Sequence, residues 1–136
     1  MLGRNPFSLF SGKTVLVVDD SDMNNSVIRA ILDRCGMNVL VAQNGAEAVA
    51  QFSQSKPFSI CAVLMDIAMP VMDGYEAAKQ IRNLDRPDSG TTPIIAVTAS
   101  VAPSDKKKTF DCGMTDFITK PVTPEVIYQT IGRYLE

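Results

Sequence analysis

The sequence contains no histidine among its 136 residues. This absence excludes catalytic triads that use histidine, zinc sites with histidine ligands and a phosphohistidine carried by the chain itself. The three cysteines, Cys35, Cys61 and Cys112, are widely spaced and form no CxxC pair, so neither a disulfide framework nor a zinc site is indicated. Any chemistry must therefore depend on carboxylates, hydroxyls, lysine and a hard metal ion.

The chain also lacks an excess of charge and a long apolar run. Thirteen basic and 15 acidic residues give a net charge of -2, so the chain has no excess of positive charge with which to bind nucleic acid or an anionic membrane. No stretch approaches the roughly 20 apolar residues of a membrane span, and the N-terminus MLGRNPFSLFSGK lacks the pattern of a secretory signal. We expect a cytoplasmic protein without direct contacts to nucleic acid or membrane.

Five short apolar runs alternate with five segments of helical periodicity. The runs predict strands at 14–18, 38–42, 59–66, 93–98 and 116–119. The periodic segments predict helices at about 23–35, around 46–52, around 77–84, at 103–112, and from Val126 to the end of the chain. This order favours a doubly wound α/β domain over residues 14–136, with helices on both faces of a parallel sheet, preceded by a tail or linker at 1–13.

Functional side chains follow four of the five predicted strands. They are Asp19-Asp20, Asp66, Thr98-Ala99-Ser100 and Lys120-Pro121, whereas Gln43-Asn44 after the remaining strand offers nothing comparable. Doubly wound sheets bind ligands at this carboxyl edge. Singly, such residues have ordinary explanations as strand-end turns or helix caps, and we expect Asp22 to be the N-cap of the first helix. Together they indicate a shared site.

Carboxylates from neighbouring strands would repel one another at this edge. Two like charges about 4 Å apart cost on the order of 4 kcal/mol at an effective dielectric near 20, unless one protonates or a cation binds. Oxygen ligands without histidine or cysteine favour Mg²⁺. Carboxylates, a lysine and a hydroxyl around one cation describe a phosphoryl site, with Asp66 as a possible nucleophile that forms an aspartyl phosphate.

Four motifs in this order carry a family resemblance: VVDD, VLMDIAMPVMDG, AVTAS and FITKP. With them the sequence resembles the receiver domain of two-component response regulators, in particular the receivers of hybrid histidine kinases, over about residues 14–135. The resemblance implies a flavodoxin-like, five-stranded parallel sheet with strand order 2-1-3-4-5.

The resemblance also implies a phosphoacceptor and a metal site. By position, Asp66 is the phosphoacceptor and, with Asp19, Asp20 and the backbone carbonyl of Ala68, a metal ligand. Asp20 would hold Mg²⁺ directly and Asp19 through water. Ala68 and Ser100 would flank the path of the hydrolytic water.

The remaining matched positions concern the phosphate and the switch. Lys120 would bind the phosphoryl oxygens, with a cis bond to Pro121. Thr98 would swing its hydroxyl toward the phosphate, Ala99 would leave it room, and Phe117 would be the aromatic switch that turns inward. Asn24 falls where many receivers of hybrid kinases carry an asparagine.

The function implied is that of a phosphorylated signalling domain rather than an enzyme, since it would catalyse only its own phosphorylation and dephosphorylation. The phosphodonor would be a histidine kinase or a histidine-containing phosphotransfer protein. The chain could be a stand-alone regulator or a module of a larger, membrane-anchored kinase. Two alternatives are a pseudo-receiver that only binds partners and a Mg²⁺-dependent phosphatase. The phosphatase would need a DxD pair, but Ile67 and Ala68 follow Asp66.

Overall fold

The computed structural model describes residues 9–99 and 102–135. Within these ranges, five strands alternate with five helices. The strands are β1 (Thr14–Val18), β2 (Asn38–Ala42), β3 (Ile60–Asp66), β4 (Ile94–Thr98) and β5 (Asp116–Thr119). The helices are α1 (Asp22–Asp33), α2 (Gly45–Gln54), α3 (Gly74–Arg82), α4 (Pro103–Asp111) and α5 (Pro124–Gly132).

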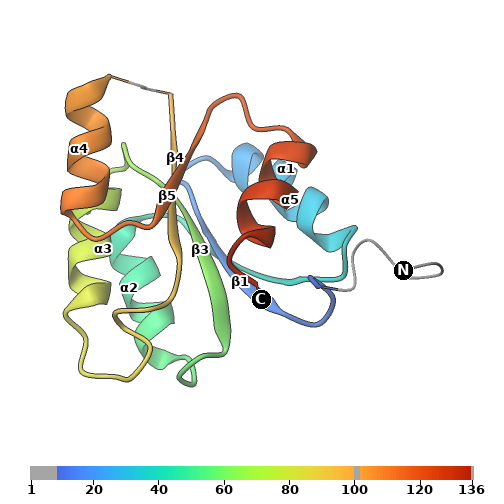
Figure 1. Cartoon of the computed structure of the whole chain (residues 1–136), viewed down its shortest axis with the longest axis horizontal. Coiled ribbons are helices and arrows are strands. Elements are labelled where there is room, and N and C mark those ends of the chain that lie inside the picture. The colour runs from blue at the N-terminus through green and yellow to red at the C-terminus, as the bar shows by residue number, and fades with distance from the viewer. Residues whose placement is uncertain (1–8, 100–101, 136) are drawn as a thin grey trace.

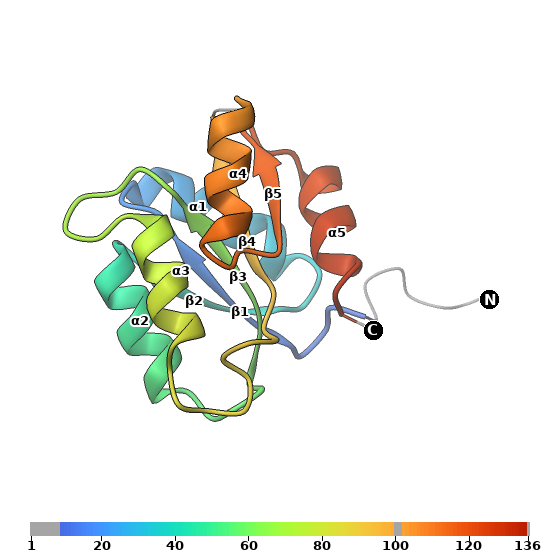
Figure 2. The same ribbon diagram turned by 60° about the vertical axis from the view of Figure 1, so that its left-hand side comes forward.

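The strands form one parallel sheet in the order β2-β1-β3-β4-β5. Helices α2, α3 and α4 cover one face of this sheet, and α1 and α5 cover the other (Figure 1). The turned view in Figure 2 shows the same two helical layers. The predicted doubly wound fold and its strand order are therefore confirmed. No helix in the described part of the chain combines the length and apolarity needed to cross a bilayer.

Two separate cores lie on the two faces of the sheet. Alternate residues of a strand point to opposite faces, so Leu16 and Val18 of β1 join the core under α2 to α4. Val15 and Val17 join the core under α1 and α5. Because both faces are covered, the central strands are apolar throughout, which is why their sequence shows no alternation.

The last residues of the predicted N-terminal tail pack on the domain. Phe10 is buried in the core under α1 and α5, and its ring centroid lies 5.8 Å from that of Tyr128. The amide N–H of Gly12 donates to the carbonyl of Gly36 at 2.9 Å. The packed part of the chain thus begins before β1.

The ends of α1 and α5 differ from the prediction. Ser21, not Asp22, is the N-cap of α1, because Ser21 has the extended backbone of a cap and its hydroxyl accepts a hydrogen bond from the amide of Asn24. The helix ends at Asp33 rather than at residue 35. Helix α5 ends at Gly132 instead of running to the end of the chain, and Tyr134 instead donates its hydroxyl to Asp116 at 2.8 Å.

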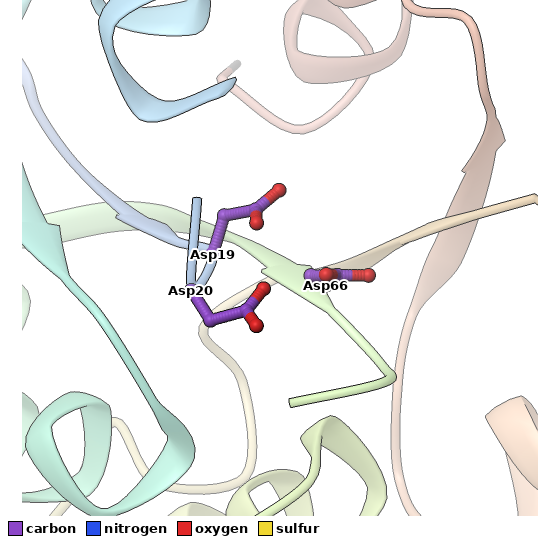
Figure 3. A group of neighbouring side chains, drawn as sticks. All are labelled: Asp19, Asp20 and Asp66. Carbon is purple, nitrogen blue, oxygen red and sulfur yellow. The ribbon is translucent and has the colours of Figure 1, made fainter. Parts of the chain in front are cut away.

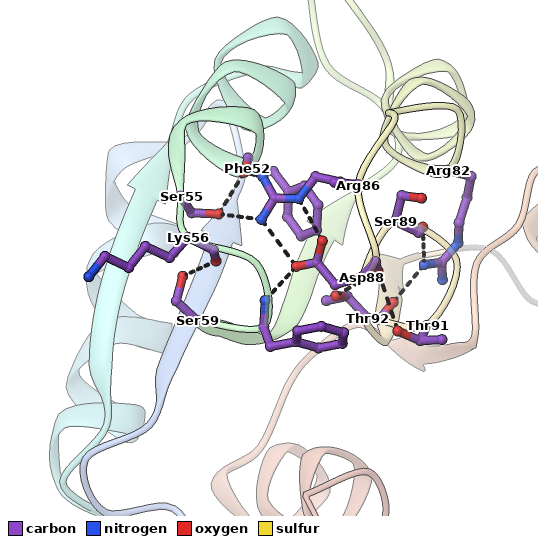
Figure 4. Close-up of polar contacts among 11 residues, drawn as sticks. Phe52, Ser55, Lys56, Ser59, Arg82, Arg86, Asp88, Ser89, Thr91 and Thr92 are labelled. Carbon is purple, nitrogen blue, oxygen red and sulfur yellow. Dashed lines mark hydrogen bonds and ion pairs between the residues drawn. The ribbon is translucent and has the colours of Figure 1, made fainter.

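The loop between α3 and β4 is built around a buried ion pair (Figure 4). The Asp88 carboxylate is fully buried and accepts hydrogen bonds from the Arg86 guanidinium and, at 2.8 Å, from the amide of Phe58. The Arg86 guanidinium also lies 4.6 Å from the ring centroid of Phe52 in α2. Burial alone would raise the pKa of Asp88, but these hydrogen bonds and the charge of Arg86 hold it below its usual range. The pair ties the loop to α2.

A second arginine, Arg82 at the end of α3, joins three segments through their polar groups. Its guanidinium donates to the carbonyl of Gly113 at 2.8 Å, to that of Thr92 at 2.8 Å and to the hydroxyl of Thr115 at 3.2 Å. Gly113 lies directly after α4 and its C-cap, Cys112. Arg82 therefore fixes the C-terminal end of α4 to α3 and to the edge of the sheet.

Candidate functional site

Three carboxylates converge at the carboxyl edge of β1 and β3. The parallel register sets Val18 opposite Met65, so the residues that follow them lie side by side. Asp19, Asp20 and Asp66 each offer a carboxylate oxygen within 4.8 Å of the others, and Figure 3 shows the three side chains gathered at one point. Asp19 and Asp66 are buried, at 2% and 7% exposure, whereas Asp20 is exposed.

Lys120 brings a positive charge to this group from the end of β5. Its Nζ lies 3.4 Å from Oδ1 of Asp66 and 3.9 Å from Oδ2 of Asp19. Burial, and next the charge of Asp19, raise the pKa of Asp66, while Lys120 and a hydrogen bond from the amide of Ile67 act in the opposite direction. The bond from Lys120 to Pro121 is cis, as expected. Lys120 thus offsets only part of the repulsion between the carboxylates.

Asp19 is held firmly by the turn that leads into α1. Its Oδ1 accepts from the amide of Ser21 at 2.9 Å, and its Oδ2 accepts from Nδ2 of Asn24 at 3.2 Å. Its backbone carbonyl accepts from Nδ2 of Asn25 at 2.8 Å. Among the described residues, none donates a hydrogen bond to Asp20, so its exposed carboxylate is left to solvent or to a ligand.

A cleft of about 430 Å³ opens over Asp66. It is lined by Asp66, Ile67, Ala68, Tyr75, Thr98, Ala99, Asp105 and Lys120. Four strand-end positions that the sequence singled out therefore share one cleft, with Ala68 beside them. Ser100 lies outside the described residues.

Tyr75 and Asp105 were not anticipated from the sequence. The hydroxyl of Tyr75 lies 3.5 Å from the carbonyl of Asp105, and this contact joins α3 to α4 across the cleft. Neither residue stands at the end of a strand or in a motif, so no signal in the sequence identified them.

The Asp73-Gly74 turn brings α3 close to the end of β3. Asp73 caps the helix by accepting a hydrogen bond from the amide of Glu76 at 2.9 Å. A Cβ at Gly74 would lie 2.4 Å from the backbone oxygen of Asp66, and the Gly74 amide donates to the carbonyl of Ile67. Only glycine allows this approach, so the turn fixes the backbone on which Asp66 and Ala68 are carried.

Phe117 lies apart from the cleft, beneath α4. Its half-buried ring makes an edge contact with Phe110, with ring centroids 6.3 Å apart, and Nζ of Lys106 lies 5.3 Å from the Phe117 ring centroid. Thr109 is the one residue of α4 that is buried. The predicted switch residue thus touches a helix that has few buried contacts.

The donor set fits a hard divalent cation. The three carboxylates supply only oxygen ligands, and the repulsion among them would be relieved by a cation. Ala68 lines the same cleft as Asp66. The described cysteines lie elsewhere: Cys35 and Cys112 are buried, and burial raises the pKa of Cys61 to about 11.

The fold and the acidic site agree with the family to which the sequence assigns the chain. Residues 15–132 match the response regulator receiver domain family, and the chain belongs to this family. It is 38% identical over 128 residues to hybrid signal transduction histidine kinase I of Dictyostelium discoideum, covering 90% of this chain and 7% of that protein. It is also 38% identical over 121 residues to signal transduction histidine-protein kinase BarA of Escherichia coli, covering 89% of this chain and 13% of that protein. The chain therefore spans a small part of these relatives.

Solved receiver structures share the fold. One is the receiver domain of sensor histidine kinase PA1611 from Pseudomonas aeruginosa, with magnesium ion coordinated in its active site cleft; it has a TM-score of 0.82 and 31% identity, covering 92% of this chain and 98% of that one. Another is the receiver domain of the Saccharomyces cerevisiae response regulator Ssk1, in a co-crystal with the histidine phosphotransfer protein Ypd1. That match has a TM-score of 0.83 and 31% identity, covering 92% of this chain and 90% of the other.

Proposed function

We propose that this domain accepts a phosphoryl group on Asp66 from a phosphohistidine of a partner protein, in a reaction that depends on Mg²⁺. The observation that carries the proposal is the position of the Asp66 carboxylate, which lies beside both the acidic pair and Lys120 and lines a cleft. The Mg²⁺ reported for the receiver of PA1611 supports the choice of ion.

In the proposed reaction, an oxygen of the Asp66 carboxylate attacks phosphorus in line with the bond to the donor imidazole. The new O–P bond forms with the carboxylate's electron pair, and the P–N electrons remain on the departing imidazole. Lys120 stays beside Asp66 and pairs with the phosphoryl oxygens.

Asp20, Asp66 and the carbonyl of Ala68 would hold the metal directly, and Asp19 would hold it through water. When bound, Mg²⁺ supplies positive charge that offsets the charge of the carboxylates and of the phosphoryl oxygens. The geometry supports these different roles for Asp20, which would bind the metal directly, and Asp19, which would bind it through water. Both oxygens of Asp19 already accept hydrogen bonds, whereas the carboxylate of Asp20 is exposed.

We infer that the signal passes from the phosphate to α4. The hydroxyl of Thr98 would move toward the phosphoryl group, with the small side chain of Ala99 leaving it room, and Phe117 would turn inward. The weak anchoring of α4, which buries only Thr109, supports its displacement. The phosphorylated domain would then present a different surface around α4 to its partner.

The donor would dock beside the site along α1. An apolar groove of about 460 Å³ adjoins the acidic cluster and is lined by Asp19, Asn24, Val27, Ile28, Val97, Lys120, Pro121 and Val122. Val27 of this lining is 50% exposed, and Met23 of the same helix is 76% exposed. The phosphohistidine must come within bonding distance of Asp66, so the donor has to dock on a surface next to the site. We expect a helix of a histidine kinase or histidine-containing phosphotransfer protein to occupy this groove. The Ssk1 complex with Ypd1 supports that partner class.

Replacing the phosphoacceptor tests the proposal. The chain and its Asp66→Asn variant are incubated with a phosphorylated histidine phosphotransfer protein and Mg²⁺, and hydroxylamine-sensitive label on the chain is measured. We expect label on the wild type and on Asp85→Asn, which makes the same chemical change at an exposed position. Undiminished label on Asp66→Asn would refute the assignment.

The alternatives give different results with other reagents. A pseudo-receiver would show no Mg²⁺-dependent spectral change on addition of beryllofluoride, which mimics the phosphoryl group. A phosphatase would turn over phosphomonoesters repeatedly. A receiver should respond to beryllofluoride and turn over no phosphomonoester.

A further inference from the structure

Asn25 occupies a position of α1 where an apolar residue would be expected. The buried residues of this helix are Asn25, Ile28 and Leu32, which follow the spacing of a core-facing stripe. Asn25 is only 3% exposed, and its Oδ1 has no hydrogen-bond partner. A buried polar atom without a partner costs about 1–3 kcal/mol. The amide is therefore poorly suited to packing, and its value must lie in the bond made by its other end.

That bond holds the main chain of a site residue. Nδ2 of Asn25 donates to the carbonyl of Asp19 at 2.8 Å, and Nδ2 of the adjacent Asn24 donates to the carboxylate of the same residue at 3.2 Å. The Asp19 amide donates to the carbonyl of Ala42, and Oδ1 accepts from the amide of Ser21. Every polar atom of Asp19 thus has a hydrogen-bond partner, and two of these four hydrogen bonds come from asparagine side chains.

Holding Asp19 in this way has an electrostatic consequence. The charges of Asp19, Asp20 and Asp66 repel one another, so a freely rotating carboxylate would turn away from the other two. The amide of Asn24 opposes that rotation, and the amide of Asn25 fixes the main chain from which the carboxylate projects. Neither adds a positive charge that would compete with a cation. Lys120 has such a charge, but it lies farther away, 3.9 Å from Asp19.

We propose that Asn24 and Asn25 are positioning residues that hold Asp19 in its metal-binding orientation before Mg²⁺ arrives, Asn24 through the carboxylate and Asn25 through the main chain. This role rests on the proposed function, which assigns Mg²⁺ to the site. It concerns two residues that touch neither the phosphoryl group nor the ion directly.

The test measures Mg²⁺ affinity by isothermal titration calorimetry on the full chain and on two variants, Asn25→Leu and Asn24→Leu. Loss of a residue that orients a metal ligand weakens metal binding by about tenfold or more, so we expect the dissociation constant to rise about tenfold in each variant. Asn24→Gln keeps a donor and should restore part of the affinity. Gln43→Ala is the matched control, since it removes a side-chain amide bond to Asp22 on the same helix without touching the three carboxylates.

Thermal unfolding without Mg²⁺ distinguishes positioning residues from purely structural ones. Loss of a purely structural residue would lower the stability of the fold and leave the affinity for Mg²⁺ unchanged. Folded Asn24→Leu and Asn25→Leu that bind Mg²⁺ like the wild type would overturn the proposal. Should Asn25→Leu fail to fold, Asn24→Leu decides alone, because Asn24 is exposed and outside the core. A wild-type chain that binds no Mg²⁺ would instead contradict the proposed function.

Discussion

The position of Asp66 disfavours the charged form of its carboxyl group. Burial and the neighbouring charge of Asp19 raise its pKa, and Lys120 at 3.4 Å compensates in part. An acid whose pKa is higher in the folded state than in the unfolded state destabilises the fold once the pH rises above the unfolded value. The residue most important for the proposed function therefore weakens the domain that carries it.

We expect Asp66→Asn to raise the free energy of unfolding by about 1 kcal/mol in metal-free buffer at neutral pH, because it removes one of three repelling charges. Urea unfolding followed by circular dichroism measures this. The gain should shrink as the pH falls below the raised pKa of Asp66 and vanish below the pKa of an aspartate in the unfolded chain, where the wild-type group is neutral in both states. Asp85→Asn, at an exposed site, should change stability little. A neutral-pH loss of stability in Asp66→Asn would contradict this explanation.

At the scale of elements, α4 carries a contact that favours the present position of Phe117. The ammonium of Lys106 lies 5.3 Å from the centroid of that ring, and Phe110 packs against its edge. Such a cation–π contact contributes about 0.5–1 kcal/mol at an exposed site. If Phe117 turns inward after phosphorylation, the contact is lost, so Lys106 favours the unphosphorylated state.

We expect Lys106→Met to tighten the binding of beryllofluoride in the presence of Mg²⁺ by about two- to fivefold, the ratio that corresponds to this energy. A fluorine NMR probe or calorimetry can measure the apparent dissociation constant. Lys107→Met is the control, because Lys107 is on the same helix but pairs with Asp111 at 3.0 Å. Equal affinities in wild type and Lys106→Met would show that the contact does not influence the switch.

At the scale of the whole molecule, the packed part of the chain begins before residue 14, where the sequence predicted the start of the domain. Phe10 is 5% exposed and fills the core under α1 and α5. We expect Phe10→Ala to lower the free energy of unfolding by about 3 kcal/mol, as for other buried aromatic residues. Phe58→Ala, at 65% exposure, should cost much less. Chemical denaturation of both variants tests this, and equal losses would show that residues 9–12 are not part of the folded unit.

The sequence predicted the features that depend on local pattern. Apolar runs and strand-end polar residues placed Asp19, Asp66 and Lys120 at one edge, because the carboxyl ends of parallel strands must meet there. It did not predict the burial of Phe10 or of Asn25. Phe10 lies in a segment without periodicity, and Asn25 is polar, so only their tertiary contacts reveal that they are buried.

The anchoring of α4 has a mechanical consequence. Arg82 holds the carbonyl of Gly113, just beyond the helix, while Thr109 in the last turn is the residue that α4 buries. At the opposite end of the helix, Asp105 of the first turn lines the same cleft as Thr98, the residue proposed to move toward the phosphate. If α4 moves on phosphorylation, we expect it to pivot about the end that Arg82 holds, so that the end near the phosphate moves farthest. A small movement of a hydroxyl beside Asp66 would be enlarged into a tilt of the surface that a partner reads.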